Sequence, residues 1–366
     1  MDKDFFNEAF KNPSKFTELH SAKKRLIKNP FENGLIAYDY EILTTLAKNP
    51  VMQSLSRENR GENHQQASPL ALLLDNHPFF QNEPEHQNSR HQAFKIISPK
   101  SMEILRSYLD NAFNKRILEL IKSGRGDLIQ SFISPVAEKL WSELSSGGSL
   151  RGDLIAKNTQ PIGDMMRYEK SSDTISAAGH AAKELRSIYQ MTKKNQANLL
   201  AALAFDFIDG LRGMTANALW QILSEATAFD RLRSDRNLVS GAWKESARLV
   251  PAVQGLSRSP IEDIEIANQK VPRGTNILML YAAGNRDPKI FRDPNLFDPK
   301  REGSQLLTFG LGARSCVGKA LSKIFGCAAI NSLLENVSKL ELLTLINWGV
   351  PGLLRTPKKL QVRIHK

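Results

Sequence analysis

The chain has only two cysteines among its 366 residues and no run of about 18 apolar residues. Two cysteines exclude a disulfide framework as the basis of the fold. The lack of a long apolar run excludes a membrane-spanning helix. Residues 1–8 are charged and lack the apolar segment of a secretory signal peptide. We therefore expect a cytoplasmic protein that does not enter a membrane.

The chain also lacks internal repeats, low-complexity tracts and a long Gly/Ser linker. Its composition, 41% hydrophobic and 24% charged, is that of a globular protein with a large core. Helical periodicity dominates residues 99–249 and predicts a mainly α protein with a few short strands. Helices are expected at residues 101–121, 199–226 and 237–249, strands at residues 35–38, 263–266, 276–280 and 360–364, and a turn at residues 272–275.

The formal net charge is +12, which suits nucleic acid, an anionic membrane or an acidic protein as partner. No nucleic-acid-binding motif accompanies the charge, and the basic residues are scattered along the sequence. Several of them, namely Lys300, Arg301, Lys319 and Lys323, lie close to Cys316 in sequence. An acidic protein partner near Cys316 and a generally basic, solvated surface are both consistent with this pattern.

Cys316 is the residue with the most informative surroundings. Two glycines, Gly310 and Gly312, precede it and predict a tightly bent loop, because glycine adopts positive φ freely. An apolar helix is expected directly after it, at residues 319–330. A thiol at a helix N-terminus lies at the positive end of the helix dipole, so we expect a lowered pKa and a thiolate that can bind metal. A buried structural cysteine beside a glycine turn is the alternative interpretation.

The residues around Cys316 resemble the signature of the cytochrome P-450 family, F-x-x-G-x-R-x-C-x-G. Phe309, Gly312, Arg314, Cys316 and Gly318 occupy its defined positions. Five such matches arise by chance at roughly one in several million sites. The resemblance implies b-type haem with Cys316 as its iron ligand. Phe309 would then shield the sulfur from water, and Gly318 would keep the chain beside it free of a side chain.

The same resemblance implies the fold. Members of this family have a helix-rich, triangular domain with small β-sheets, and the resemblance covers residues 1–366 as a single domain. The polar segment 49–82, interrupted by Gly and Pro, would be the loop that roofs the pocket in such a protein.

A second set of residues resembles the proximal scaffold of the family. Glu245 and Arg248 lie one helical turn apart, as in the E-x-x-R pair, and stand 71 residues before the cysteine (316 − 245). Residues 297–301 match F-x-P-x-R, which implies that Arg301 completes a Glu–Arg–Arg network. We interpret all three residues as structural.

Haem propionates need cationic or hydrogen-bonding partners, and four residues resemble those of the family. His86 and Arg90 are four residues apart, as in H-x-x-x-R, so both face one side of a helix. Arg258 lies just before an expected strand, and Arg314 lies within the cysteine loop. Each of them singly could be a surface charge, but together and in this order they favour a propionate site.

The oxygen-activating helix departs from the family pattern. Aligned on residues 215–219, Thr-Ala-Asn-Ala-Leu, the acid position holds Gly213 and the alcohol position holds Met214. Neither residue can relay protons. Thr215 supplies a hydroxyl one residue later, rotated by about 100° around the helix. Asp209 lies one turn before the usual acid.

Arg212 offers a different comparison within the same helix. Arg212 and Gly213 resemble the Arg-Pro pair of the fatty-acid peroxygenase branch, in which the Arg binds the substrate carboxylate. An arginine can hold a carboxylate through two parallel hydrogen bonds. The alternative is that Arg212 points away from the pocket and contacts a neighbouring helix. If the alignment holds, Arg212, Met214 and Thr215 line the distal side of the pocket.

Three functional hypotheses follow. The first is a monooxygenase that oxidises a small, moderately apolar molecule as a monomer, with electrons from an acidic ferredoxin or flavodoxin and protons from water or a substrate group. The second is a peroxygenase, isomerase or dehydratase, which would not need the acid–alcohol pair. The third is a haem-binding protein without turnover, such as a substrate-presenting partner or a sensor.

Overall fold

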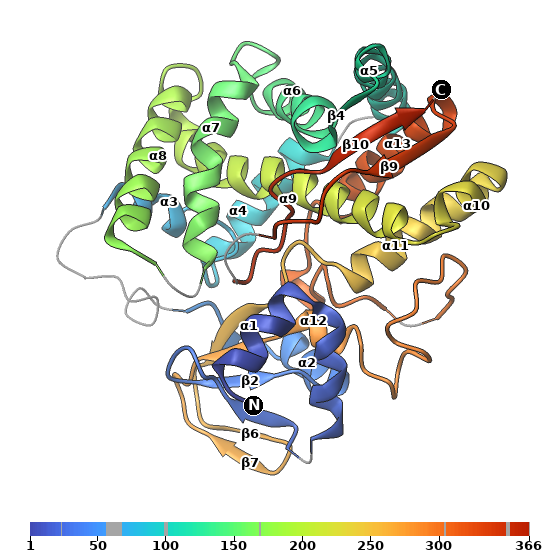
Figure 1. Cartoon of the computed structure of the whole chain (residues 1–366). Helices are drawn as coiled ribbons and strands as arrows, with labels where there is room; N and C mark the ends of the chain where they lie inside the picture. Colours follow the sequence, from blue (N-terminus) through green and yellow to red (C-terminus); the bar gives the residue numbers. More distant parts are fainter. Residues whose placement is uncertain are drawn as a thin grey trace.

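The computed structural model describes residues 1–22, 24–55, 68–98, 102–167, 170–303, 305–348 and 352–365. Most of its helices gather in one half of the molecule, and its largest sheet lies in the other half beside the N-terminus (Figure 1). The expected mainly α fold with small β-sheets is confirmed. None of the helices in the described ranges is both long enough and apolar enough to cross a membrane.

The helices belong to both halves of the molecule. They are α1 Lys3–Lys11, α2 Tyr40–Lys48, α3 Pro69–Asp75, α4 Glu85–Ile97, α5 Met102–Ser123, α6 Ser134–Ser146, α7 Gly152–Gly163, α8 Ser172–Gln190, α9 Ala197–Ser224, α10 Ala228–Ser234, α11 Val239–Leu249, α12 Tyr281–Gly284 and α13 Lys319–Asn336. The strands are β1 Leu26–Lys28, β2 Leu35–Ala37, β3 Met52–Gln53, β4 Arg125–Asp127, β5 Leu256–Pro260, β6 Ile264–Ile266, β7 Gln269–Val271, β8 Ile277–Met279, β9 Lys339–Leu342 and β10 Gln361–His365.

Helix α9 crosses the middle of the helical half (Figure 1). Its sequence is rich in Ala and Leu and has no proline, so it favours helix over its whole length. It is buried on most sides because it packs against α6, α7, α8, α11 and α13. Its acidic residues, Asp206 and Asp209, are therefore exceptions in an apolar helix.

The largest sheet has five strands in the order β1-β2-β8-β5-β3. Strands β2 and β8 pair in parallel, and the other neighbours are antiparallel. A three-stranded sheet, β4-β10-β9, lies on the helical half, and β6 and β7 form a separate hairpin. Buried apolar side chains of β2 and β8, with the partly buried Leu256 of β5, pack under α1, α2 and α12, which gives this half its own core.

Most of the expected elements occur within two residues of their predicted ends. The helices at 101–121, 199–226 and 237–249 correspond to α5, α9 and α11, although residue 101 lies outside the described ranges. The turn at 272–275 is confirmed: the Thr275 amide donates to the Pro272 carbonyl over 3.2 Å, and Gly274 has φ +77°. Strand β7 was not predicted, because its hairpin turns through Ala267 and Asn268 instead of a glycine.

The prediction that residues 49–82 form only a loop is wrong for the described part of the segment. It contains β3 and α3, while residues 56–67 lie outside the described ranges. Ser68 caps α3 by accepting the Ala71 amide, and Pro69 occupies the first turn, where its missing N–H costs nothing. Among the residues after α3, His77, Pro78 and Phe79 line a cavity of the protein.

Candidate functional site

A large cavity lies between α9, the segment after α3 and the loop that contains Cys316. Together with its opening to solvent it encloses about 1950 Å³. Its wall is mostly apolar, with a few polar side chains that come from segments far apart in the sequence. Such a cavity is the usual form of a site for a cofactor and a small molecule.

Cys316 lines this cavity and lies just before the N-terminus of α13. The loop before it bends at Gly310 and Gly312, with φ of +63° and +64°. These are left-handed values that glycine adopts without strain. The Cys316 amide donates to the Phe309 carbonyl over 2.7 Å and closes the loop. The side chain of Cys316 is not covered, and its free surface faces the cavity.

In the protein alone the surroundings of Cys316 raise the pKa of its thiol, whereas the sequence predicted a lowered pKa. Burial in the cavity wall is the largest effect and raises the pKa of this thiol, and the Asp206 carboxylate raises it further; together they exceed the lowering by the Gly318 and Lys319 amides and by Arg90. The helix N-terminus therefore acts in the expected direction but is outweighed by desolvation. A metal ion bound to the sulfur would reverse this balance, because coordination deprotonates a thiol.

The other residues of the cysteine loop do not all line the cavity. Phe309 is buried, lines the cavity and stacks on Trp243, with ring centroids 5.6 Å apart. A side chain added at Gly318 would begin 3.7 Å from the Cys316 sulfur, so glycine leaves the space beside the sulfur open. Gly312 is not among the residues that line the cavity, and its backbone packs against the end of α2 instead.

Helix α4 places His86 and Arg90 on the cavity wall, one turn apart. Arg90 donates to the backbone and the hydroxyl of Ser315, so it already supports the cysteine loop. His86 is buried and its Nδ1 lies 2.9 Å from the Glu83 carboxylate. Burial lowers the pKa of His86, although Glu83 opposes this shift. Both side chains lie where an anionic group in the cavity could reach them.

Arg258 is a buried cation that lacks an acidic partner among the described residues. It lies within β5, a strand that was not predicted, and before β6, which corresponds to the expected strand at residues 263–266; its side chain lines the cavity. Its guanidinium lies 4.2 Å from the ring centre of Phe79 and donates to the Ser257 carbonyl over 3.0 Å. Burial lowers the pKa of Arg258 to about 10. Burying a guanidinium without a carboxylate costs free energy. The position of Arg258 therefore favours the binding of an anionic group that is not part of the protein chain.

Arg314 lines the cavity but is held by protein groups in this structure. It donates to the Ser54 hydroxyl, the Gln81 carbonyl and the Asn82 side chain over 2.9–3.0 Å. Burial lowers its pKa. Arg314 thus ties the cysteine loop to the segment that covers the cavity, a link that the sequence did not indicate.

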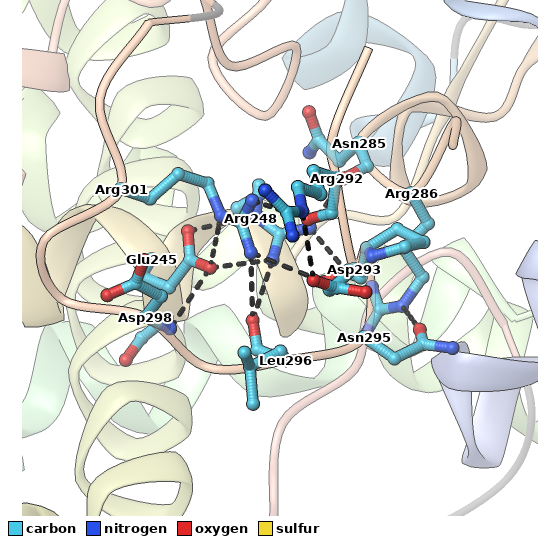
Figure 2. A network of polar contacts seen from close by, with 12 residues as sticks. Glu245, Arg248, Asn285, Arg286, Arg292, Asp293, Asn295, Leu296, Asp298 and Arg301 are labelled. Carbon is cyan, nitrogen blue, oxygen red and sulfur yellow. Dashed lines mark hydrogen bonds and ion pairs between the residues drawn. The ribbon is translucent and has the colours of Figure 1, made fainter. Parts of the chain in front are cut away.

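The Glu245 network has the geometry expected from the sequence (Figure 2). Glu245 accepts two hydrogen bonds from Arg248, at 2.6 and 2.9 Å, and one from Arg301 at 2.8 Å. Arg248 is fully buried and also donates to the carbonyls of Asn285 and Pro294. These contacts fasten α11 to the chain between residues 285 and 301.

The same scaffold reaches the cysteine loop through Thr308. The Thr308 hydroxyl donates to the Ala247 carbonyl over 2.7 Å and accepts from the Asn285 side chain over 2.8 Å. Asn285 also accepts the Leu307 amide over 2.9 Å. The loop that presents Cys316 is therefore held by α11 and residue 285, both of which belong to the Glu245 network.

Gly213 and Met214 of α9 occupy the positions where the family has an acid and an alcohol, and their surroundings differ. Met214 lines the cavity, and its sulfur accepts the Ala252 amide over 3.2 Å. Gly213 is buried against the C-terminal segment: a Cβ there would lie 2.6 Å from the Thr356 hydroxyl and 3.1 Å from the Ala252 Cβ. Close packing therefore excludes an acidic side chain at residue 213.

Arg212 and Thr215 do not line the cavity, so the expectation that they face its distal side is wrong. Arg212 pairs with Asp209 on the preceding turn and lies near Glu138 of α6. Burial lowers the pKa of Arg212. Thr215 is buried, and its hydroxyl has no hydrogen-bond partner among the described residues. Both residues are turned towards neighbouring helices because successive residues rotate by about 100° around α9.

The cavity also contains three polar residues for which the sequence predicted no role. Asp206 and Asp209 of α9 line it, and His77 faces Asp206 from the segment after α3. The two acids were detectable as the only charged residues before Arg212 in an apolar helix. His77 carried no signal in the sequence, because its role depends on a contact between distant segments.

Gly213→Ala is expected to destabilise the protein by about 1–3 kcal/mol, because the added methyl group overlaps with Thr356 and Ala252. Gly210→Ala is the matched control on the previous turn of α9, where no atom lies within 4 Å of the added Cβ. The control is expected to stabilise the helix by up to about 1 kcal/mol. Thermal unfolding of both variants measures the difference, and equal melting temperatures would refute the packing argument.

The residues of the cavity fit a haem with a thiolate ligand. The Arg258 guanidinium, which has no carboxylate partner in the part of the chain that the structure describes, suits a propionate, and glycine at residue 318 leaves open space beside the Cys316 sulfur. The cavity has a thiol at one wall and apolar side chains over most of the rest. No cluster of three or more His, Cys, Asp or Glu residues that could hold a bare metal ion occurs in the described part of the chain.

Comparison with known proteins agrees with this geometry. The family model "Cytochrome P450", here written P-450, matches residues 227–360. The biotin biosynthesis cytochrome P-450 of Bacillus subtilis (strain 168) is 22% identical over 364 residues, covering 92% of this chain and 92% of that protein. The polyketide biosynthesis cytochrome P-450 PksS of the same strain is 23% identical, covering 80% and 79%.

Solved structures show the same fold. The BioI cytochrome P-450 in complex with hexadec-9Z-enoic acid ligated to acyl carrier protein has a TM-score of 0.90 at 20% identity, covering 98% of this chain and 100% of that chain. A myxobacterial cytochrome P-450 in complex with myristic acid has a TM-score of 0.85 at 22% identity, covering 99% and 98%. The chain is thus similar over most of its length to bacterial cytochromes P-450, a family of monooxygenase-type oxidoreductases with a haem-thiolate cofactor.

Proposed function

We propose that the protein is a monooxygenase with b-type haem that oxidises a small, moderately apolar molecule using dioxygen and electrons from an acidic ferredoxin or flavodoxin. The observation that carries the proposal is a largely apolar cavity with a free cysteine thiol in its wall. When bound, a haem-thiolate supplies the activation of oxygen that the protein's own side chains cannot provide. A single domain over residues 1–366, a monomeric state and a cytoplasmic location belong to the same proposal.

The protein's own residues divide into a cofactor-holding set and a substrate-facing set. Cys316 is the proposed iron ligand, and His86, Arg90, Arg258 and Arg314 are the proposed propionate partners. Arg90 and Arg314 also keep their present hydrogen bonds to the cysteine loop and to the covering segment. In this arrangement one set of cations both neutralises the carboxylates and fixes the loop that carries the sulfur.

The substrate-facing set is apolar and comes from several elements. Its side chains exclude water and bind apolar surface, which suits oxidation of an unactivated carbon or an aromatic ring. Support comes from two structural neighbours whose ligands are named as hexadec-9Z-enoic acid and myristic acid, both long apolar chains. The main contributors are Met52, Phe79, Leu203, Phe207, Leu211, Met214, Val253, Leu256 and Leu354.

A peroxygenase that uses a substrate carboxylate has less support from the geometry. That reaction needs a cation near the distal helix, and the residue suggested for it was Arg212. Arg212 is paired with Asp209 and is not among the cavity-lining residues. Proton delivery by water or by a substrate group remains part of the monooxygenase proposal, because Gly213 and Met214 cannot carry protons.

The electron source provides the test of this proposal. We expect oxidation of an apolar substrate by the haem-loaded protein with dioxygen and a reduced ferredoxin, and little product with hydrogen peroxide alone. Product is measured by mass spectrometry, and incorporation of labelled oxygen from dioxygen identifies the oxidant. Turnover that needs only peroxide would favour the peroxygenase. Absence of turnover with both oxidants across a broad substrate panel would favour a haem-binding protein without catalysis.

Arg258→Met is expected to change haem retention and haem-free stability in opposite directions. Removing an unpaired buried cation should raise the melting temperature of the haem-free protein. Loss of a charge-assisted hydrogen bond, contributing roughly 1.5–3 kcal/mol, should weaken haem binding by about tenfold or more. Haem transfer to an acceptor protein measures retention, and Arg258→Lys is the charge-conserving control. Equal retention in Arg258→Met and the native protein would remove Arg258 from the propionate site.

A further inference from the structure

The C-terminal segment places a hydroxyl group against the part of α9 where the acid and the alcohol of the family are missing. Thr356 lines the cavity, as do Met214 and Ala252. A Cβ at Gly213 would lie 2.6 Å from the Thr356 hydroxyl oxygen, so this oxygen occupies the space in which a side chain of residue 213 would begin. Glycine at residue 213 therefore leaves room for a hydroxyl group from a distant segment of the chain.

The neighbours of Thr356 along the chain fix its position. The Arg355 amide donates to the Ala252 carbonyl over 2.8 Å, and the Arg355 carbonyl accepts from the Asn217 side chain of α9 over 2.8 Å. Pro357 follows, and a proline favours an extended conformation in the residue before it. The Thr356 side chain is thus held beside α9 by contacts of the backbone, which leaves its hydroxyl group free for another role.

The Thr356 hydroxyl group is available to a molecule in the cavity. Thr356 is half-buried, and its hydroxyl makes no hydrogen bond with another residue of the described ranges. The Thr215 hydroxyl of α9 is enclosed by the protein, whereas the Thr356 hydroxyl keeps accessible surface at the cavity wall. A threonine hydroxyl can donate and accept hydrogen bonds at the same time, so it can hold a water molecule or another oxygen atom.

Monooxygenation consumes protons as well as electrons. One oxygen atom of dioxygen enters the substrate and the other leaves as water, so a proton must accompany each electron that the ferredoxin or flavodoxin delivers. A hydroxyl group relays a proton when it donates its own proton and accepts another from water, which leaves the group itself unchanged. Gly213 and Met214 cannot act in this way, and Thr215 does not line the cavity.

We propose that Thr356 replaces the missing alcohol of α9, and that its hydroxyl group holds water on the distal side of the cavity and relays protons from solvent during oxidation. The inference rests on the proposed function, because it names a residue for the proton delivery that a monooxygenase needs. Asn217 and Arg355 fix the backbone of the relay segment and do not contact the substrate. Gly213 allows the hydroxyl to reach this place.

The first test detects the hydroxyl group without turnover. Carbon monoxide is bound to the reduced holoenzyme, and its stretching band is recorded by infrared spectroscopy in ordinary and deuterated water. A hydrogen-bond donor beside the oxygen atom of carbon monoxide lowers the frequency of this band, because it stabilises negative charge on that atom. Thr356→Val removes the hydroxyl and keeps the shape of the side chain, so the band should move to higher frequency. An unchanged band in this variant would overturn the proposal.

The second test measures proton delivery during turnover. Product formation with dioxygen and reduced ferredoxin should fall roughly 100-fold in Thr356→Val, because the relay hydroxyl is lost. Thr356→Ser keeps a hydroxyl and should restore most of the product and the native infrared band. Thr215→Val is the matched control, since it removes a hydroxyl of α9 that does not line the cavity, and it should change neither measurement. Native turnover in Thr356→Val would refute the relay.

The same samples separate this inference from the proposed function. The visible spectrum of the ferrous carbonyl adduct is recorded first for each protein. A thiolate-type spectrum in Thr356→Val together with a native infrared band and native turnover refutes the relay alone. Absence of the thiolate-type spectrum in the native protein refutes the proposed function itself. Thr356→Ala also lacks the hydroxyl and gives the same comparison if the valine variant does not retain haem.

Discussion

Cys316→Ser is expected to abolish the thiolate-type spectrum of the ferrous carbonyl adduct. The serine hydroxyl stays protonated where a metal-bound thiol is deprotonated, so the electron donation that defines a haem-thiolate is lost. The variant should retain the fold, because Cys316 faces the cavity and its amide bond to the Phe309 carbonyl involves only the backbone. Oxidation of any substrate should fall to background in the same preparation.

Cys327→Ser provides the matched control, since Cys327 is the only other cysteine in the chain. It lies on α13 and is half-buried against the helical core. Burial raises the pKa of Cys327 to about 11, so this thiol is protonated at neutral pH. The control should therefore keep the thiolate-type spectrum. A native-like spectrum in Cys316→Ser, or its loss in Cys327→Ser, would move the iron ligand away from Cys316.

Glu245→Gln is expected to destabilise the protein by about 3–5 kcal/mol, because it leaves two guanidinium groups without their shared carboxylate. Arg248 is fully buried and cannot regain water. The variant should also retain haem poorly, since the network connects through Asn285 and Thr308 to the cysteine loop. Chemical denaturation of the haem-free protein and haem transfer measure the two effects separately.

The control for this prediction is an ion pair of the same spacing on the surface. Arg116 and Glu119 of α5 are three residues apart with an N–O distance of 2.9 Å, and their side chains are 36% and 49% exposed. Glu119→Gln should change the free energy of unfolding by less than about 1 kcal/mol. An equally small change in the free energy of unfolding for Glu245→Gln and Glu119→Gln would show that the buried network does not hold the proximal scaffold.

The sequence alone was sufficient to predict the local structural features of this protein. The cysteine loop could be predicted because its glycines, its cysteine and the start of α13 are contiguous, and positive φ at Gly310 and Gly312 depends on local sterics. Helix α9 was predictable from an uninterrupted Ala- and Leu-rich stretch. Glu245 and Arg248 were predictable as a pair because helix geometry places residues three apart on one face.

Only the tertiary structure decided which side chains face the cavity. Arg212 lies on the same helix as Met214, yet one pairs with Asp209 behind the wall and the other lines the cavity. A helix rotates by about 100° per residue, so a small uncertainty in alignment changes the face of every side chain. Packing of α9 against its neighbours removes that uncertainty.

The polar contacts within the site could not be predicted from the sequence either. His77 meets Asp206, and Arg314 meets Gln81, between segments that are far apart along the chain. Arg258 has no carboxylate partner within the described ranges, and no local sequence pattern predicts this. The sequence by itself determined the thiol loop, the main helices and the resemblance to a family. The fold decided the donors and acceptors in the cavity, because their positions depend on long-range packing that no single segment encodes.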